Sequence, residues 1–596
     1  MSTFGDLLHY LKIYRRYIGR RIYLVFGLTV AVALTQGFGI TLLLPLLRAS
    51  QSDGTEDMSW AEATLHELLT WMGIADYLPG ILAFIALVFV AKGGLQFLKG
   101  GYVGYLQSQL LKELKTRLFD AYSRMTYRYY IRQNAGHFIN VINQQVNRFF
   151  QSFTSFTGFF SKIVTTGSYF AFAIAWRFAL MAFGVGIGLL FLFKYLNAYV
   201  RRLSRERSAE MSTLNKLLVQ SLQAFKYIVG TNQTAHLRSG VVDSVERLTG
   251  YILRQRIAGS FTSAIKEPVS VLLIVGLIAL QVMAFDGAIA PIFVALLLFH
   301  RGMQSMMTVQ SRWQVTMDKI GAVEMVTDEF DAVYEHEEQD GKRELRTLQQ
   351  GIAFDDVHFA YNPDDGDVLH DINIEVPVNR TVALVGESGA GKSTLVDLLT
   401  LMLKPRTGTV EIDGVPHDEV DLASWRDQIG YVSQETVVFD DTVANNIHLW
   451  QGNVDEDPAL RERMIHAAER AHADHFIRKL PNGYQTVVGD RGVRLSGGQR
   501  QRLFVARELF KQPNLLLLDE ATSDLDTASE QHIQNSIDAL KGEVTVVTIA
   551  HRLSTVKNAD RVYVLDEGRV IEAGTYHELR AREDGEFREM VEMQSL

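Results

Sequence analysis

The sequence has no cysteine among its 596 residues. This absence excludes disulfides, thiolate nucleophiles and cysteine-ligated zinc, and it leaves the redox compartment open. A surplus of positive charge is lacking as well, because the formal net charge is −9. A net negative chain gives no reason to expect nucleic acid as a partner. The charged fraction of 21% and the hydrophobic fraction of 47% argue against a disordered chain.

Long apolar segments are present, and they lie in the first half of the chain. The mean hydropathy of +0.04 is high for a water-soluble protein and low for one embedded entirely in lipid. No charged residue occurs from Ile22 to Leu47, which at about 1.5 Å per helical residue is enough to cross a hydrocarbon layer of about 30 Å. We predict six transmembrane helices, the other five near 79–99, 155–176, 178–199, 258–285 and 287–305.

A cleaved signal peptide is the alternative for the first of these segments. Its apolar stretch is longer than the roughly 7–15 residues of a signal-peptide core, and no small-residue cleavage pattern follows Pro45, so a transmembrane helix is favoured. The preceding residues, 4–17, have the pattern of an amphipathic helix at the membrane surface.

Basic residues predict the orientation of the spans. Five basic residues precede the first span, whereas the loop 48–78 has one basic residue and six acidic ones. The stretches after the second and fourth spans are basic again, and they are long and polar with helical periodicity. The positive-inside rule therefore places both termini in the cytoplasm, with helices that extend beyond the membrane on that side.

The character of the sequence changes after Met325. Residues 328–347 are rich in charge and contain no long apolar run, which is typical of a linker. Beyond Gly351, short β-branched runs alternate with helical stretches, the pattern of an α/β domain with a parallel sheet. We predict a transmembrane domain with cytoplasmic helical extensions over 1–330, a linker over 331–350 and a soluble domain over 351–596.

A glycine-rich loop follows the predicted strand 381–385 and precedes a helical stretch. In this context the pattern G-x-x-x-x-G-K-S indicates phosphate binding, because glycines let backbone N–H groups surround phosphate oxygens and the helix N-terminus adds positive charge. Lys392 is expected to reach the β- and γ-phosphates, and Ser393 to offer its hydroxyl to Mg²⁺. The candidate nucleotide-binding residues are Gly386, Glu387, Ser388, Gly389, Ala390, Gly391, Lys392, Ser393 and Thr394.

Two carboxylates follow an apolar run further along the chain. The leucines 515–518 directly precede Asp519 and Glu520. A buried strand that ends in this way places Asp519 near the Mg²⁺ ligands and Glu520 against the attacking water. The alternative is a strand that ends in ordinary acidic surface residues.

A second glycine-rich helix start lies just upstream of these carboxylates. It consists of Ser496, Gly497, Gly498 and Gln499, followed by a helix-forming run over 500–510. Such a helix N-terminus is a second candidate anion site. Two such sites with a single phosphate loop suggest that two copies of the chain pair.

These motifs resemble those of ATP-binding-cassette (ABC) transporters, specifically a half-transporter of the six-helix exporter type. LSGGQ at 495–499 resembles the family signature, and its order relative to the phosphate loop and LLLLDE at 515–520 is that of the family. The resemblance covers nearly the whole chain. It implies a polytopic α-helical membrane domain with six transmembrane helices, fused to a cytoplasmic α/β P-loop ATPase domain that hydrolyses ATP with Mg²⁺.

The resemblance also implies roles for individual residues. Tyr361 in FAYNP resembles the aromatic residue that stacks on adenine. Gln434 in YVSQET resembles the Q-loop glutamine, a catalytic and Mg²⁺-binding residue that links the nucleotide site to the membrane helices. Glu520 resembles the catalytic base. Asp526 in SDLD resembles the D-loop aspartate, and His551 in IAHRLS the switch histidine that contacts the γ-phosphate.

Two positions depart from the family pattern. Asp524 stands where alanine is usual in the D-loop, and Asp490 where glutamate is usual before the signature. Neither departure removes a catalytic group, although Asp524 bears on communication across a dimer. The family implies a head-to-tail dimer in which Ser496 and Gly498 of one copy complete the ATP site of the other. Because every hydrolytic element is intact, a homodimer is the simplest expectation, and a heterodimer with a degenerate partner is the alternative.

Several cations lie within the predicted spans, and Lys92 in the second span and Arg301 in the sixth are the hardest to explain by snorkelling or by a neighbouring acid. A charge inside a membrane costs at least about 2.5 kcal/mol on insertion scales, so it tends to face a cavity or a partner. The segments 39–47 and 295–304 resemble those of exporters that flip polyprenyl-pyrophosphate-linked oligosaccharides. A pyrophosphate head group would need the bidentate fork of Arg301 and the point charge of Lys92. The alternative is that Arg301 pairs with an acid or with cytosolic water.

We therefore expect ATP-driven export or flipping of an amphipathic, anionic lipid-linked substrate by alternating access in a dimer, within the lipids of a bacterial inner membrane. A multidrug or peptide exporter is the first alternative, although no peptidase domain precedes the first span. A non-transporting ABC channel or regulator is the second alternative, against which the intact Glu520 and His551 weigh.

Overall fold

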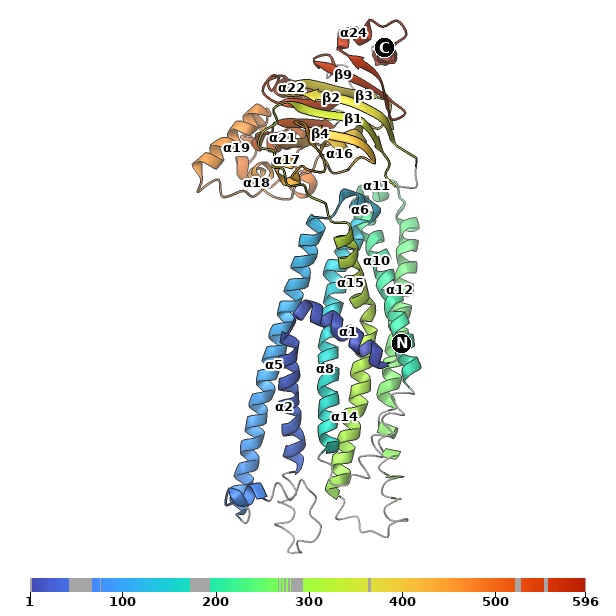
Figure 1. Ribbon diagram of the computed structural model, residues 1–596, viewed down its shortest axis with the longest axis vertical. Helices are drawn as coiled ribbons and strands as arrows, with labels where there is room; N and C mark the ends of the chain where they lie inside the picture. Colours follow the sequence, from blue (N-terminus) through green and yellow to red (C-terminus); the bar gives the residue numbers. More distant parts are fainter. Residues whose placement is uncertain are drawn as a thin grey trace. The chain divides into compact units, whose positions relative to one another are not determined.

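The computed structural model describes residues 3–41, 67–74, 77–171, 193–265, 293–362, 366–519, 527–550 and 556–594, with short pieces between 267 and 279. The chain divides into two compact units (Figure 1). The first unit comprises 1–125 and 129–337, and the second comprises 126–128 and 338–596.

The first unit is built from helices. They are α1 (Thr3–Ile18), α2 (Arg21–Thr41), α5 (Leu78–Ser123), α6 (Tyr127–Arg132), α7 (Ala135–Asn140), the π-helical segment η1 (Val141–Gln145), α8 (Val146–Ala171), α10 (Lys194–Gln223), α11 (Phe225–Gly230), α12 (Thr234–Ala264), α14 (Phe293–Asp318) and α15 (Ile320–Glu335). The helical extensions expected beyond the second span are present, because α5 continues to Ser123. The segment 331–350, expected as a linker, begins inside α15.

An aromatic face of α8 forms the centre of this unit. Phe149, Phe153 and Phe156 recur at helical spacing and are all buried. Their rings surround Tyr14 of α1 at centroid distances of 5.6, 5.4 and 5.0 Å, and the Tyr14 hydroxyl donates to Ser152 Oγ at 2.8 Å. The amphipathic helix expected near the N-terminus therefore exists, but the face that carries Tyr14 is buried against protein.

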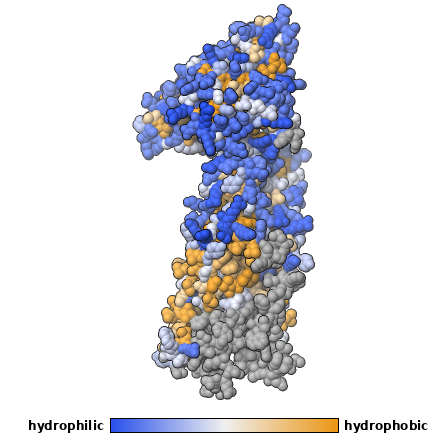
Figure 2. Space-filling model, viewed as in Figure 1, coloured by the Kyte–Doolittle hydropathy of each residue, from blue (hydrophilic) through white to orange (hydrophobic). Residues whose placement is uncertain are grey.

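Apolar side chains cover the outside of α5. Leu87, Val90 and Phe97 are 64%, 72% and 79% exposed, and Figure 2 shows hydrophobic residues gathered over α2 and α5. An exposed apolar surface of this kind is typical of contact with lipid. Within the described residues, α5 alone is long and apolar enough to cross a membrane, and the pair 7–18 and 21–35, bent by 118°, passes the same test together. The other expected spans extend into residues outside the described ranges.

The second unit contains two sheets and their covering helices. Its strands are β1 (Gly351–Phe359), β2 (Leu369–Pro377), β3 (Thr381–Gly386), β4 (Thr407–Ile412), β5 (Val415–Pro416), β6 (Ile429–Val432), β7 (Leu515–Asp519), β8 (Thr545–Ile549), β9 (Arg561–Asp566) and β10 (Arg569–Gly574). Its α-helices are α16 (Lys392–Leu399), α17 (Leu422–Arg426), α18 (Val443–His448), α19 (Pro458–Arg470), α20 (Asp474–Ile477), α21 (Gly497–Phe510), α22 (Thr527–Asp538), α24 (Tyr576–Arg580) and α25 (Glu586–Gln594).

The expected parallel sheet is accompanied by a second, antiparallel sheet. The six-stranded sheet has the order β10-β9-β3-β8-β7-β6 and is parallel except for its edge strand β10. The four-stranded sheet has the order β2-β1-β4-β5. All residues of β7 and β8 are buried, as expected for strands covered on both faces, whereas β2 alternates between buried and accessible residues. This difference in burial distinguishes the two sheets.

The six-stranded sheet separates two hydrophobic cores. Leu515 and Leu517 of β7 belong to the core that contains α16, whereas Leu516 and Leu518 belong to the core that contains α21. Successive side chains of a strand point to opposite faces of its sheet. Helices α16 and α21 therefore cover opposite faces.

Candidate nucleotide site

The glycine-rich loop joins β3 to α16, so the predicted strand–loop–helix arrangement is present. The strand is buried from Thr381 to Val385, which fixes the start of the loop within the sheet. Gly389 and Gly391 have φ values of 92° and 96°, in the left-handed region that favours glycine. A Cβ at Gly391 would also lie 2.5 Å from Leu369 Cδ2. The loop conformation therefore depends on glycine at these positions.

Lys392 is buried at the first turn of α16. Its ammonium donates to the carbonyl oxygens of Gly386 at 2.9 Å and Glu387 at 2.7 Å. Around it, Glu387 and Ser388 are exposed and Ala390 is buried. The positive charge is therefore held at the loop, where phosphate oxygens would compete with the carbonyls for its protons.

Tyr361 lies against the start of α16. Its hydroxyl is 3.0 Å from Thr394 Oγ1, and its ring meets that of Phe359 edge to face at a centroid distance of 5.0 Å. Thr394 is buried, whereas Ser393 is exposed. The structure thus brings the expected adenine-stacking residue next to the phosphate loop.

Gln434 follows β6, and Asp519 is the last residue of the neighbouring parallel strand β7. Val432 at the end of β6 is the register partner of Leu518 in β7, and β3 runs parallel within the same sheet. Since the carboxyl ends of parallel strands meet at one edge, the phosphate loop, Gln434 and Asp519 share that edge. Asp519 is buried and Gln434 is exposed. Ligand sites of open α/β sheets occur at this edge.

Asp397 of α16 is a site residue that the sequence analysis missed. Burial, together with the negative charge of Asp519, raises the pKa of Asp397 from 3.8 to about 6. Burial and the same two carboxylates also raise the pKa of Tyr431. The sequence held only a weak signal for Asp397. Asp397 follows Ser393 by four residues and therefore shares its helix face, but it belongs to no motif.

The oxygen atoms that this edge of the sheet offers are of the kind that Mg²⁺ binds. The hydroxyl of Ser393, the amide oxygen of Gln434 and the carboxylate of Asp519 are oxygen ligands of the kind that Mg²⁺ prefers. A carboxyl whose pKa is raised by a neighbouring carboxylate is stabilised in its ionised form by a nearby cation. The Asp397–Asp519 pair is an observation of this structure that suits a divalent ion.

The second glycine-rich motif begins α21. Ser496 Oγ accepts from the Gln499 backbone N–H at 3.3 Å, and Gln499 Oε1 accepts from the Ser496 N–H at 2.9 Å. This reciprocal pair is a capping box, so the Gln499 side chain fixes the helix start. Ser496 and Gly497 are exposed and Gly498 is buried. The first turn of α21 has the features of an anion-binding helix N-terminus.

Three expected catalytic or nucleotide-contacting residues, Glu520, Asp526 and His551, lie outside the described residues. The strands before them are described. Asp519 at the end of β7 is the register partner of Ile549 at the end of β8. The chain therefore leaves the sheet at neighbouring points before Glu520 and before His551.

The two expected substrate residues lie in the first unit. Lys92 of α5 has its ammonium 5.0 Å from the centre of the Phe89 ring, and its charge interacts with that of Arg301. Arg301 of α14 is exposed, and no carboxylate among the described residues forms an ion pair with it. The structure therefore brings both cations into one electrostatic neighbourhood.

Comparisons with known proteins agree with this architecture. A family model described as ABC transporter matches residues 369–523, and one described as ABC transporter transmembrane region matches residues 24–306. Similar curated proteins include the ATP-dependent lipid A-core flippase of Coxiella burnetii, 32% identical over 86% of each chain. The protein of the same name from Haemophilus influenzae is 31% identical over 86% of this chain and 88% of its own. A solved bacterial Atm1-family ABC exporter with ATP bound is 25% identical, covers 98% of both chains and has a TM-score of 0.78.

Proposed function

The chain belongs to the ABC transporter family, and from this membership we propose that it is an ATP-driven flippase for an anionic lipid-linked substrate. The half-transporter architecture, the membrane-embedded helical domain and the ATP-hydrolysing domain are those of an ABC exporter. The substrate class is the finer part of the proposal. The relatives named ATP-dependent lipid A-core flippases support it.

The observation that best supports an anionic substrate is the pair of cations Lys92 and Arg301. Two neighbouring cations repel one another in a membrane-spanning region, where an unpaired charge is expensive. Arg301 has no carboxylate partner among the described residues, which weakens the alternative of an internal ion pair. A phosphate-bearing head group would neutralise both charges, and Arg301 would bind it with two parallel hydrogen bonds.

A homodimer is the second part of the proposal. Helices α16 and α21 cover opposite faces of the six-stranded sheet, so the sheet lies between the phosphate loop and the Ser496 motif of one chain. This separation supports a site in which Ser496 and Gly498 of a second copy face the phosphate loop of the first.

Within such a site each residue has a distinct task. Lys392 and the loop N–H groups would hold the phosphates, and Tyr361 would stack on the adenine. Ser393, Gln434 and Asp519 would hold Mg²⁺, which supplies charge neutralisation for phosphoryl transfer. Glu520 would take the proton from the attacking water, and His551 would contact the γ-phosphate. Asp526, in the D-loop, would couple the two ATP sites of the dimer.

We propose that both termini are cytoplasmic and that the membrane is a bacterial inner membrane. The basic residues before the first span and the acidic loop 48–78 support this orientation. Since the chain has no cysteine, a single cysteine introduced at Asp57 is a clean probe. We expect an impermeant maleimide to label it only from outside the cell membrane. Labelling only from the cytoplasmic face contradicts the orientation.

Translocation of a defined lipid tests the substrate class. In proteoliposomes, Arg301→Ala should abolish ATP-dependent translocation of a bisphosphorylated lipid A while basal ATPase activity persists, because only the head-group contact is removed. Arg312→Ala on the same helix is the matched control, since Arg312 is also exposed and is expected to retain translocation. Unchanged translocation by the Arg301 variant, or transport of neutral lipids only, contradicts the proposal.

A further inference from the structure

A cavity of about 580 Å³ lies between α10, α12 and the end of α14. Its lining includes Arg207 from α10, Gln255 and Arg256 from α12, and Gln314, Asp318 and Lys319 at the end of α14. None of these residues belongs to the nucleotide site or to the Lys92–Arg301 pair. A volume of this size is typical of small-molecule sites and exceeds that of a single ion.

Three buried donor atoms of the lining have no hydrogen-bond partner among the described residues. They are the amide nitrogens of Gln255 and Gln314 and the Nε atom of Arg207. Gln255 is 7% exposed and Gln314 is 4% exposed. Buried polar groups in folded proteins are almost always hydrogen-bonded, so unpaired donors point to a missing acceptor. All three unpaired groups are donors, and the oxygen atoms of an anion accept hydrogen bonds from donors.

The charge around the cavity is positive. Arg207, Arg256 and Lys319 line it, and among the described lining residues Asp318 is the only carboxylate. Asp318 lies 3.3 Å from the ammonium of Lys319, so part of its charge is already neutralised. Arg207 donates to Gln255 Oε1 at 3.1 Å, which is a neutral acceptor. The lining therefore has two positive charges in excess.

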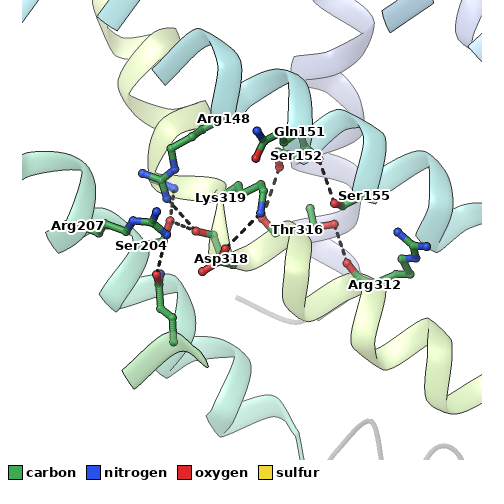
Figure 3. A network of polar contacts seen from close by, with 12 residues as sticks. Arg148, Gln151, Ser152, Ser155, Ser204, Arg207, Arg312, Thr316, Asp318 and Lys319 are labelled. Carbon is green, nitrogen blue, oxygen red and sulfur yellow. Dashed lines mark hydrogen bonds and ion pairs between the residues drawn. The ribbon is translucent and has the colours of Figure 1, made fainter. Parts of the chain in front are cut away.

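Arg148 of α8 adds a further cation behind this lining. Figure 3 shows Arg148 and Arg207 approaching Asp318 and Lys319 from two different helices. The Arg148 guanidinium donates to Ser208 Oγ at 2.9 Å and to the Asp318 carbonyl oxygen at 3.1 Å. Burial, followed by the positive charge of Arg207, lowers the pKa of Arg148 to about 10. The existing partners therefore do not fully compensate the positive charge.

The position of the cavity along the helices suggests the source of the anion. The sixth predicted span ends near 305 and the fifth begins near 258, whereas the cavity lining lies over 252–263 and 311–319. At about 1.5 Å per residue, Gln314 lies about 20 Å along α14 from Arg301. The cavity is thus at the cytoplasmic boundary of the predicted spans, where phospholipid head groups lie.

We propose that this cavity binds the phosphate-bearing head group of the lipid substrate on the cytoplasmic side, before the head group reaches Arg301. The inference rests on the proposed flippase function and adds a first binding site to it. Phosphate oxygens accept several hydrogen bonds at once, which matches the three unpaired donors and the excess charge. The cavity volume leaves room for the sugar that carries the phosphate.

Binding measurements on the full-length protein in detergent test this site. The variants are Arg256→Gln and Gln314→Leu, and the matched control is Arg254→Gln, whose side chain is exposed on α12 but does not line the cavity. The probes are bisphosphorylated lipid A, the same lipid after phosphatase treatment, and inorganic phosphate. We expect both cavity variants to raise the Kd for lipid A about tenfold, the loss expected for one charge-assisted hydrogen bond. The control should stay within about twofold.

Thermal unfolding separates binding from folding. Gln314→Leu removes a buried donor that has no partner, so its unfolding temperature should equal or exceed that of the original protein. Weaker lipid A binding without a loss of stability supports the cavity as a site. Equal binding of lipid A by all variants overturns it, as does loss of binding that follows loss of stability.

The probes also distinguish failure of the site from failure of the proposed function. Cavity-dependent binding of inorganic phosphate with cavity-independent binding of lipid A overturns the head-group assignment in favour of a soluble anion. If lipid A does not bind at all but phosphate binding depends on Arg256 and Gln314, the flippase proposal is contradicted and phosphate recognition by the cavity is supported. If lipid A binding depends on the cavity, the site is supported even where Arg301→Ala still translocates.

Discussion

The phosphate loop and the cavity between α10, α12 and α14 both hold positive charge, but they hold it differently. In the loop, the Lys392 ammonium donates to two carbonyls of the same loop. In the cavity, the amide nitrogens of Gln255 and Gln314 are buried without a partner among the described residues. The donors of Lys392 therefore have acceptors within the loop, whereas the buried donors of the cavity need an acceptor from elsewhere.

The two regions correspond to two proposed ways to recognise phosphate. The loop uses backbone N–H groups, whose positions follow from the left-handed glycines Gly389 and Gly391 and from a helix start. The cavity uses side chains from three helices, which packing must bring together. A backbone site can serve every nucleotide in the same way, whereas a side-chain site can be adapted to one substrate by single replacements.

The largest expected effect is on ATP turnover and ATP binding, and it is confined to the nucleotide site. Glu520→Gln should lower ATP turnover by about 10²–10⁴-fold, because the proposed general base would be lost, while ATP should still bind and hold the proposed dimer closed. Lys392→Ala should instead weaken ATP binding itself, by about tenfold or more, because a charge-assisted contact to phosphate is removed. Turnover and the Kd for ATP are measured on the purified variants.

The same two variants also probe the cavity. Without nucleotide, both should bind lipid A with the affinity of the original protein, since neither residue belongs to the cavity. Near-normal turnover by Glu520→Gln shows that another group is the base. A changed lipid A affinity in nucleotide-free protein shows that the two regions are not independent.

A smaller effect concerns the stability of the nucleotide site. The pKa of Asp397 in the folded protein is about 6, above its ordinary value of 3.8, so protonation favours the folded state. This stabilisation is complete below about pH 4 and is lost as the pH rises through about 6. Asp397→Asn, which stays neutral, should therefore raise the unfolding midpoint at pH 7.5 by roughly 2–4 °C for each kcal/mol of relieved repulsion.

Two comparisons sharpen this prediction. At about pH 3 the Asp397 variant and the original protein should unfold at nearly the same temperature, because the carboxyl is then largely protonated in both the folded and the unfolded state. Asp455→Asn is the matched control, since Asp455 is exposed, and it should leave the midpoint unchanged at both pH values. A variant that is less stable at pH 7.5 contradicts the raised pKa of Asp397, which burial and then the charge of Asp519 produce.

Much of the nucleotide site was predictable because its residues are local in sequence. The strand, the loop and the helix around Lys392 are contiguous, and the carboxylates after β7 follow an uninterrupted apolar run. The antiparallel sheet was missed, although the alternating burial of β2 corresponds to a pattern in the sequence. The strand pattern was assigned to a single parallel sheet because strand partners are not encoded locally.

The sequence by itself therefore determined the family, the apolar spans and the phosphate loop, since each depends on neighbouring residues along the chain. The tertiary structure alone decided that the charge of Asp519 acts on Asp397, that α16 and α21 lie on opposite faces of one sheet, and that Arg207, Gln255 and Gln314 line one cavity. These residues are far apart in sequence or separated by a sheet. Their electrostatics and unpaired donors arise only when packing excludes water around them.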